Sequence, residues 1–291
     1  LVMTATPIPR TVALTVFGDL ETSTLRELPR GRQPITTNAI FINEKPQWLT
    51  RAWQRIAEEV AAGRQAYVVA ARIDGNGDKK DGDKDGKEAG PPATPVGELY
   101  ERLRTGALAG LRLGLMHGRL SADEKDAVMS AFRAGEVDVL VSTTVIEVGV
   151  DVPNSTVMVV MDADRFGISQ LHQLRGRIGR GEHPSLCLLA TKHSEDSKVA
   201  DRLKAVAGTL DGFALADLDL AERREGDVLG HSQSGRPITL QFLSLAEHLD
   251  VILAAREMCI DLYEVDAGHR GMALLAGQFT TTDRIEFLDK V

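Results

Sequence analysis

The sequence has little cysteine: Cys187 and Cys259 are the two present, and they lie far apart in apolar or helical stretches. Two such residues give neither a disulfide framework nor the paired spacing of a zinc site, so we expect no metal ligands. We expect both to be buried thiols in a reducing cytoplasm. The sequence also lacks an apolar run near the roughly 18 residues of a membrane span, and no charged segment followed by an apolar one opens it. A cytoplasmic protein without a membrane partner is therefore expected.

An excess of basic charge is also missing. The chain has 34 Lys and Arg against 42 Asp and Glu, a formal net charge of −8. Because phosphate contacts need clustered Lys and Arg, any contact with DNA must be local. An initiator methionine is absent as well, and Leu1-Val2-Met3 resembles the last residues of a strand. Both features predict that a preceding segment is missing.

Strand-like apolar runs alternate with helical patterns over residues 36–193. This alternation with short connections predicts an α/β fold with a doubly wound, mostly parallel sheet. In such sheets functional residues gather at the carboxyl ends of strands. The expected strands are 36–42, 65–71, 111–116, 137–142, 156–162 and 185–191, and the expected helices are 46–63, 98–108, 121–135 and 168–179.

Two stretches depart from this alternation. Residues 74–95 are rich in Gly, Asp, Lys and Pro, which cannot offset the entropy of ordering, so a disordered insertion is expected there. From 194 onward helical patterns replace strands, so we predict one lobe over 36–193 and a smaller, mainly helical region over 194–291. Helices are expected there at 198–210, 213–224, 240–265 and 284–290.

The most specific segment runs from Gln170 to Gly181. Arg177 and Arg180 are three residues apart, which on one helical face would let two guanidinium groups reach one anion. A basic exposed helix is the alternative. The segment resembles motif VI of superfamily 2 helicases, Gln-x-x-Gly-Arg-x-Gly-Arg, beginning at Gln173. The resemblance implies that Arg177 and Arg180 are arginine fingers for the γ-phosphate of ATP, worth roughly 10³ to 10⁵ in rate, and that Gln173 lies near the nucleotide.

Residues 142–153, Ser-Thr-Thr-Val-Ile-Glu-Val-Gly-Val-Asp-Val-Pro, follow a predicted strand. Hydroxyl and backbone N–H groups at such a turn form a phosphate cradle. The segment resembles helicase motif V. That resemblance implies DNA-backbone contacts for Thr143 and Thr144, a coupling role for Glu147, and a place near the nucleotide ribose for Gly149 and Asp151.

Two shorter segments resemble further helicase motifs. His117 and Arg119 follow a predicted strand as in motif IVa, which implies contacts with the DNA backbone, although a His there is more often a structural hydrogen-bonding group. Thr4 and Thr6 lie in Thr-Ala-Thr-Pro, which resembles motif III and implies coupling between nucleotide state and DNA grip. Residues 1–35 would then be a linker from a first motor lobe.

Among these helicases the chain resembles the RecG family. Residues 3–11 occur in RecG and in the transcription-repair coupling factor, whereas 16–20 and 27–35 look like RecG. Residues 219–235 resemble the translocation motif that both families share, which implies coupling roles for Arg223 and Gln233. The match departs from the usual motif at Ala221, Glu222, Glu225 and Ser232.

The resemblance implies an ATP-dependent helicase that translocates on double-stranded DNA, regresses stalled forks and branch-migrates Holliday junctions. ATP and Mg²⁺ would be held mainly by the missing first lobe, because no Gly-x-x-x-x-Gly-Lys-Ser/Thr loop is present, and this chain alone should be inactive. Its partners would be branched DNA, that lobe and an N-terminal wedge domain, at a cytoplasmic, nucleoid-associated location. A transcription-repair coupling translocase and a non-catalytic DNA- or protein-binding module remain alternatives.

Overall fold

This computed structural model describes residues 33–71, 93–144, 152–222 and 249–265. A single parallel sheet organises the described residues up to Asp219. The strand order is β1-β6-β5-β2-β4-β3, and every neighbouring pair is parallel, which confirms the predicted sheet. The strands are β1 (Ile35–Phe41), β2 (Gln65–Val69), β3 (Leu113–Met116), β4 (Val139–Ser142), β5 (Ser155–Val160) and β6 (Ser185–Thr191).

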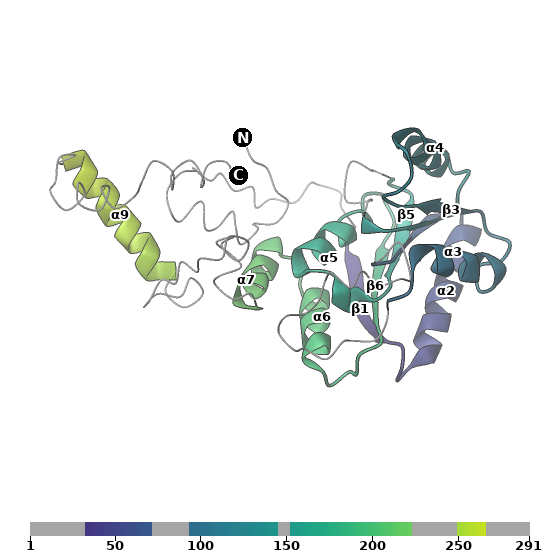
Figure 1. The fold of residues 1–291 in the computed structure, drawn as a ribbon, viewed down its shortest axis with the longest axis horizontal. Helices are drawn as coiled ribbons and strands as arrows, with labels where there is room; N and C mark the ends of the chain where they lie inside the picture. The colour runs from purple at the N-terminus through teal and green to yellow at the C-terminus, as the bar shows by residue number, and fades with distance from the viewer. Residues whose placement is uncertain (1–32, 72–92, 145–151, 223–248, 266–291) are drawn as a thin grey trace. The chain divides into compact units, whose positions relative to one another are not determined.

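Helices cover both faces of this sheet (Figure 1). Buried side chains of α2 and α3 form a core on one face, and those of α4, α5, α6 and α7 form a core on the other. β2 lies between β4 and β5, and its five residues are all buried, as expected for a central parallel strand. The helices are α2 (Pro46–Ala61), α3 (Val96–Thr105), α4 (Ala122–Arg133), α5 (Ile168–Arg175), α6 (Lys198–Gly208), α7 (Gly212–Glu222) and α9 (Leu249–Val265), with a 3₁₀ turn η2 (Ala163–Arg165).

The start of α4 is fixed by the predicted capping box. The hydroxyl of Ser121 accepts a hydrogen bond from the Glu124 N–H at 3.3 Å, and the Glu124 carboxylate accepts one from the Ser121 N–H at 2.8 Å. These bonds satisfy donors that a helix N-terminus otherwise leaves unpaired.

The end of α5 differs from the prediction. The helix ends at Arg175, Gly176 is its C-cap, and Gly179 has a φ of +71°. Arg177 and Arg180 therefore do not share one helical face, and that expectation was wrong. Beyond Arg175 the backbone hydrogen bonds run three residues back, from Arg177 to Leu174 and from Ile178 to Arg175, so the chain leaves the α-helix as a tighter turn before the left-handed Gly179.

The cysteine prediction was half right. Cys187 on β6 is buried, and burial raises the pKa of its thiol to about 12. Cys259 on α9 is exposed, so its predicted burial was wrong. The apolar composition of α9 gave no clear stripe that would place this residue on a buried face.

The compact unit that contains the sheet includes described residues as far as Asp219. Leu203 and Val206 of α6 and Leu215 of α7 belong to one of its two cores. The division into 36–193 and 194–291 stays a prediction. The helix expected at 284–290 and nearly all of the insertion expected at 74–95 lie outside the described residues.

Candidate functional site

His117 and Thr143 lie together at the carboxyl edge of the sheet. Met116, the last residue of β3, pairs with Ser142, the last residue of β4. The Thr143 N–H donates a hydrogen bond to the Met116 carbonyl at 3.2 Å. The two segments that follow these strands therefore leave the sheet side by side.

The side chains at this edge suit an anionic ligand. Nδ1 of His117 is buried and has no hydrogen-bond partner within the described ranges, Arg119 is exposed, and Thr144 is partly exposed. Lys125 of α4 reaches back to the carbonyl of Gly118 at 3.1 Å. Sequence reasoning missed Lys125, although its place one turn after the Ser121 cap was a usable signal.

The segment after α5 lies at the opposite, amino edge of the sheet. A Cβ added to Gly179 would come within 2.6 Å of Ile35 Cγ1, and one added to Gly181 would come within 2.4 Å of the Pro153 carbonyl oxygen. Ile35 begins β1, and Pro153 lies just before β5. The two glycines thus permit a close approach that places the Arg177–Arg180 turn beside the starts of these strands.

The two arginines lie on a tight turn. The Arg177 N–H donates to the Leu174 carbonyl at 2.9 Å, and Nε of Arg180 donates to the Gly176 carbonyl at 2.9 Å. Gln173 and Arg177 are partly exposed, and Arg180 is exposed. Two guanidinium forks from one turn can bind the oxygens of a phosphate.

Arg175, two residues before Arg177, is buried with only 2% of its surface exposed. Its Nη1 donates to the carbonyls of Val206 and Thr209, at 2.8 and 2.7 Å. Sequence reasoning treated this residue as part of the motif only. Its spacing from Leu171 and Leu174 places it on the buried face of α5, and that spacing could have identified it.

A buried polar network occupies the carboxyl end of β5. Asp162 has left-handed backbone, with a φ of 48°, and is 3% exposed. Its carboxylate accepts a hydrogen bond from the Thr94 N–H at 2.9 Å and lies 3.3 Å from Nζ of Lys192, just beyond β6. The network ties the segment before α3 to the same edge as His117 and Thr143.

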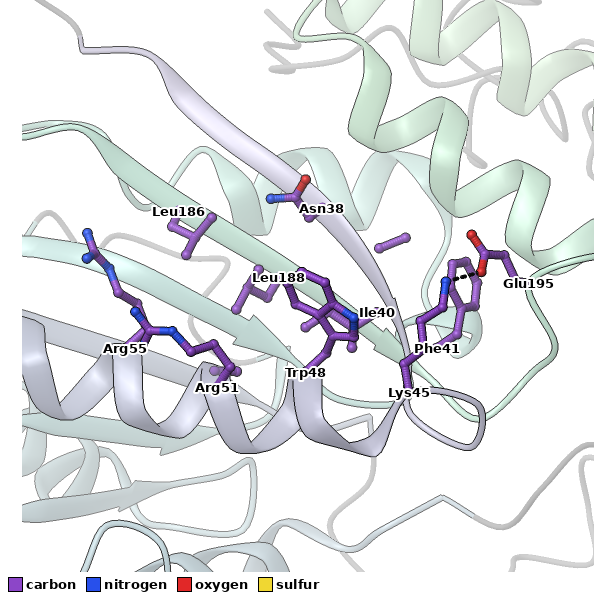
Figure 2. Close-up of a pocket in the computed structure, with 12 residues that line it drawn as sticks. Asn38, Ile40, Phe41, Lys45, Trp48, Arg51, Arg55, Leu186, Leu188 and Glu195 are labelled. Atoms are coloured by element: carbon purple, nitrogen blue, oxygen red, sulfur yellow. Dashed lines mark hydrogen bonds and ion pairs between the residues drawn. The ribbon is translucent and has the colours of Figure 1, made fainter.

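A groove of about 540 Å³ lies elsewhere, between β1, β6 and α2. Trp48, which is 54% exposed, and Arg51 border it, and Lys45 pairs with Glu195 at one end (Figure 2). No predicted site residue lines this groove. Across the described ranges, no group of three or more His, Cys, Asp or Glu residues is placed to hold a metal ion, and no helix is long and apolar enough to cross a membrane.

The remaining predicted site residues lie outside the described residues. They are the coupling candidates Thr4, Thr6, Glu147, Arg223 and Gln233, and the nucleotide candidates Gly149 and Asp151.

Comparisons with known proteins find similar chains among helicases. Residues 96–182 match the family described as the helicase conserved C-terminal domain. ATP-dependent DNA helicase RecG of Mycobacterium tuberculosis (strain H37Rv) is 70% identical over 290 residues, covering 100% of this chain and 38% of that protein. RecG of Bacillus subtilis (strain 168) is 43% identical, covering 92% of this chain and 36% of that protein.

A solved structure of RecG bound to a three-way DNA junction is also similar. It is 36% identical with a TM-score of 0.61, and the match covers 86% of this chain and 30% of that one. The chain thus spans less than two fifths of the length of these relatives.

Proposed function

The chain belongs to the RecG family of ATP-dependent DNA helicases, and from that premise we propose that it is the second motor lobe of an enzyme that remodels branched DNA. The observation that carries the proposal is that two sets of basic and polar side chains lie at opposite edges of one sheet. One set surrounds Arg177 and the other surrounds His117. A motor lobe needs both, because it must contact ATP on one side and DNA on the other.

On the amino edge, Arg177 and Arg180 act as arginine fingers. Their guanidinium groups stabilise the charge that develops on the γ-phosphoryl oxygens of ATP, and Gln173 helps to hold the nucleotide. The undescribed Gly149 and Asp151 are assigned to the ribose side. The sequence has no Gly-x-x-x-x-Gly-Lys-Ser/Thr loop, so we assign Mg²⁺ and the β,γ-phosphates to the first lobe and expect the 291-residue chain alone to be inactive.

On the carboxyl edge, His117, Arg119, Thr143 and Thr144 hold the DNA backbone, and Lys125 adds a cation beside them. The unpartnered Nδ1 of His117 supports this assignment, because a buried ring nitrogen without a partner is unfavourable until a ligand approaches. The net charge of −8 confines DNA binding to such local contacts.

The wider roles follow from the family. The substrates are stalled forks and Holliday junctions, and the partners are the first lobe and the N-terminal wedge domain of the same full-length protein. Coupling between the edges is assigned to Thr4, Thr6, Glu147, Arg223 and Gln233. A DNA enzyme of this kind works in the cytoplasm, at the nucleoid.

Two other functions remain testable. A transcription-repair coupling translocase shares the motor, but the 70% identity to RecG favours RecG. A non-catalytic binding module has no need for two arginines on a turn that two closely packed glycines fix in place.

ATP turnover by a full-length RecG that carries this chain tests the proposal. Wild type should be stimulated by branched DNA, and Arg177→Ala should lose turnover while it still binds nucleotide, since the first lobe holds most of the phosphates. The exposed Arg102 of α3, outside both edges, provides the control Arg102→Ala. Unchanged turnover in Arg177→Ala would contradict the motor function and favour the binding module.

A further inference from the structure

Arg175 joins the end of α5 to the end of α6. Both carbonyls that its Nη1 reaches lie at the C-terminus of α6: Val206 is in the last turn, and Thr209 is the C-cap residue. The last carbonyls of a helix have no partner within the helix and carry the negative end of its dipole. A buried guanidinium satisfies these carbonyls, and they in turn compensate its charge.

A third contact orients the guanidinium plane. Nη2 of Arg175 lies 2.8 Å from Nδ1 of His172, one turn earlier in α5. Because arginine stays protonated and only donates, His172 must accept through an unprotonated Nδ1 and carry its proton on Nε2. The guanidinium therefore has partners on both α5 and α6.

The turn that bears the arginines is built directly on Arg175. The Ile178 N–H donates to the Arg175 carbonyl at 3.3 Å, and Arg175 is the last residue of α5. Beyond Arg177, the turn is held by the buried Ile178 and by the close packing of Gly179 against Ile35. Arg177 lies between that anchor and Arg175, so its position depends also on where the end of α5 is held.

We propose that Arg175 is a positioning residue for ATP hydrolysis: it holds the end of α5 on the C-terminus of α6 and so sets the reach of the Arg177 side chain toward the γ-phosphate. This inference rests on the proposed function, because it assigns Arg175 an effect only through Arg177. Lysine cannot replace it, since one ammonium group cannot reach two carbonyls and the His172 ring in a fixed plane.

The test uses the full-length protein with Arg175→Met, Arg175→Lys and His172→Leu, each alone and combined with Arg177→Ala. Both Arg175 variants should lower kcat at saturating branched DNA by about 10- to 100-fold, the effect expected of a misplaced catalytic group. The KM for ATP and the affinity for DNA should stay within about twofold of wild type, because neither ATP binding nor DNA binding depends on Arg177 alone. His172→Leu should give a smaller fall, and His172→Asn, which restores an acceptor, should recover it.

The combined variants separate positioning from a general structural role. If Arg175 acts through Arg177, the double variant Arg175→Met with Arg177→Ala should be no slower than Arg177→Ala alone. The proposal would be overturned if the double variant lost kcat by the product of the two single losses. Equal falls in kcat and in DNA affinity in the Arg175 variants would also overturn it. Should Arg175→Met fail to fold, Arg175→Lys and His172→Leu give the same comparison. Loss of turnover in Arg177→Ala with no loss in the Arg175 variants would refute only the positioning role, whereas unchanged turnover in Arg177→Ala would refute the proposed function itself.

Discussion

Replacing Gly179 by alanine should destabilise the sheet-bearing unit more than the same change at Gly63. Both glycines have left-handed backbone, with φ of +71° and +81°. A Cβ at Gly63 meets no atom within 4 Å, whereas one at Gly179 would lie 2.6 Å from Cγ1 and 2.9 Å from Cδ1 of Ile35. The comparison therefore separates backbone strain from crowding against β1.

The two contributions have different sizes. Left-handed backbone costs an alanine about 1 to 2 kcal/mol, and both variants carry this cost. Crowding against a packed side chain adds about 1 to 3 kcal/mol, and Gly179→Ala alone carries it. We therefore expect a loss in unfolding free energy of about 2 to 5 kcal/mol for Gly179→Ala against about 1 to 2 kcal/mol for Gly63→Ala.

Urea unfolding followed by the fluorescence of the buried Trp53 provides the assay. Ile35→Ala removes the side-chain atoms that crowd the added Cβ, so in that background the cost of Gly179→Ala should fall to that of Gly63→Ala. Equal costs for the two variants in the wild-type background, or no relief from Ile35→Ala, would refute the close packing of the arginine-bearing turn on β1.

Two further predictions concern ionisable groups. Burial raises the pKa of Glu59, but the hydrogen bond from Arg64 and further polar contacts outweigh it and leave the pKa below its usual range. The ionised carboxylate therefore stabilises the folded state above the unfolded-state pKa, and this stabilisation is lost as pH falls through the folded-state pKa. In urea titrations, Glu59→Gln should lower the free energy of unfolding by about 1.5 to 3 kcal/mol at neutral pH and by much less at about pH 3. Independently, a thiol-reactive dye at mildly alkaline pH should label the exposed Cys259 in the native protein, and Cys187, with a pKa of about 12, only after unfolding; rapid labelling of Cys187 would contradict its burial.

Most of the fold was predictable because its signals are local. After Gln65, residues 66–71 are aliphatic or aromatic, as a strand buried on both faces requires, and the Ser121–Glu124 pair identified the start of α4. The end of α5 was missed because the helical pattern continues past Arg175. Gly179, where the backbone is left-handed, lies close to Ile35, and that neighbour is distant in sequence.

The candidate site residues could be named from the sequence, but their arrangement in space could not. We expected functional residues at the carboxyl ends of strands, and His117 and Thr143 are there. Arg177 and Arg180 instead precede β6 by a few residues and lie at the amino edge, which follows from chain direction in a parallel sheet. The burial of Arg175 could be read from its helical spacing, whereas its carbonyl partners on α6 required the folded structure.

The central claim is that ATP is contacted at the amino edge of the sheet and DNA at the carboxyl edge. A DNA titration of ATP turnover tests it most directly. In the full-length protein, Arg177→Ala should lower kcat by about 10³-fold or more with the half-saturating concentration of branched DNA unchanged. His117→Ala should instead raise that concentration and leave kcat at saturating DNA near wild type, and Arg102→Ala should change neither. If Arg177→Ala weakened DNA activation as His117→Ala does, or kept wild-type turnover, the assignment of ATP to the amino edge and DNA to the carboxyl edge would be contradicted.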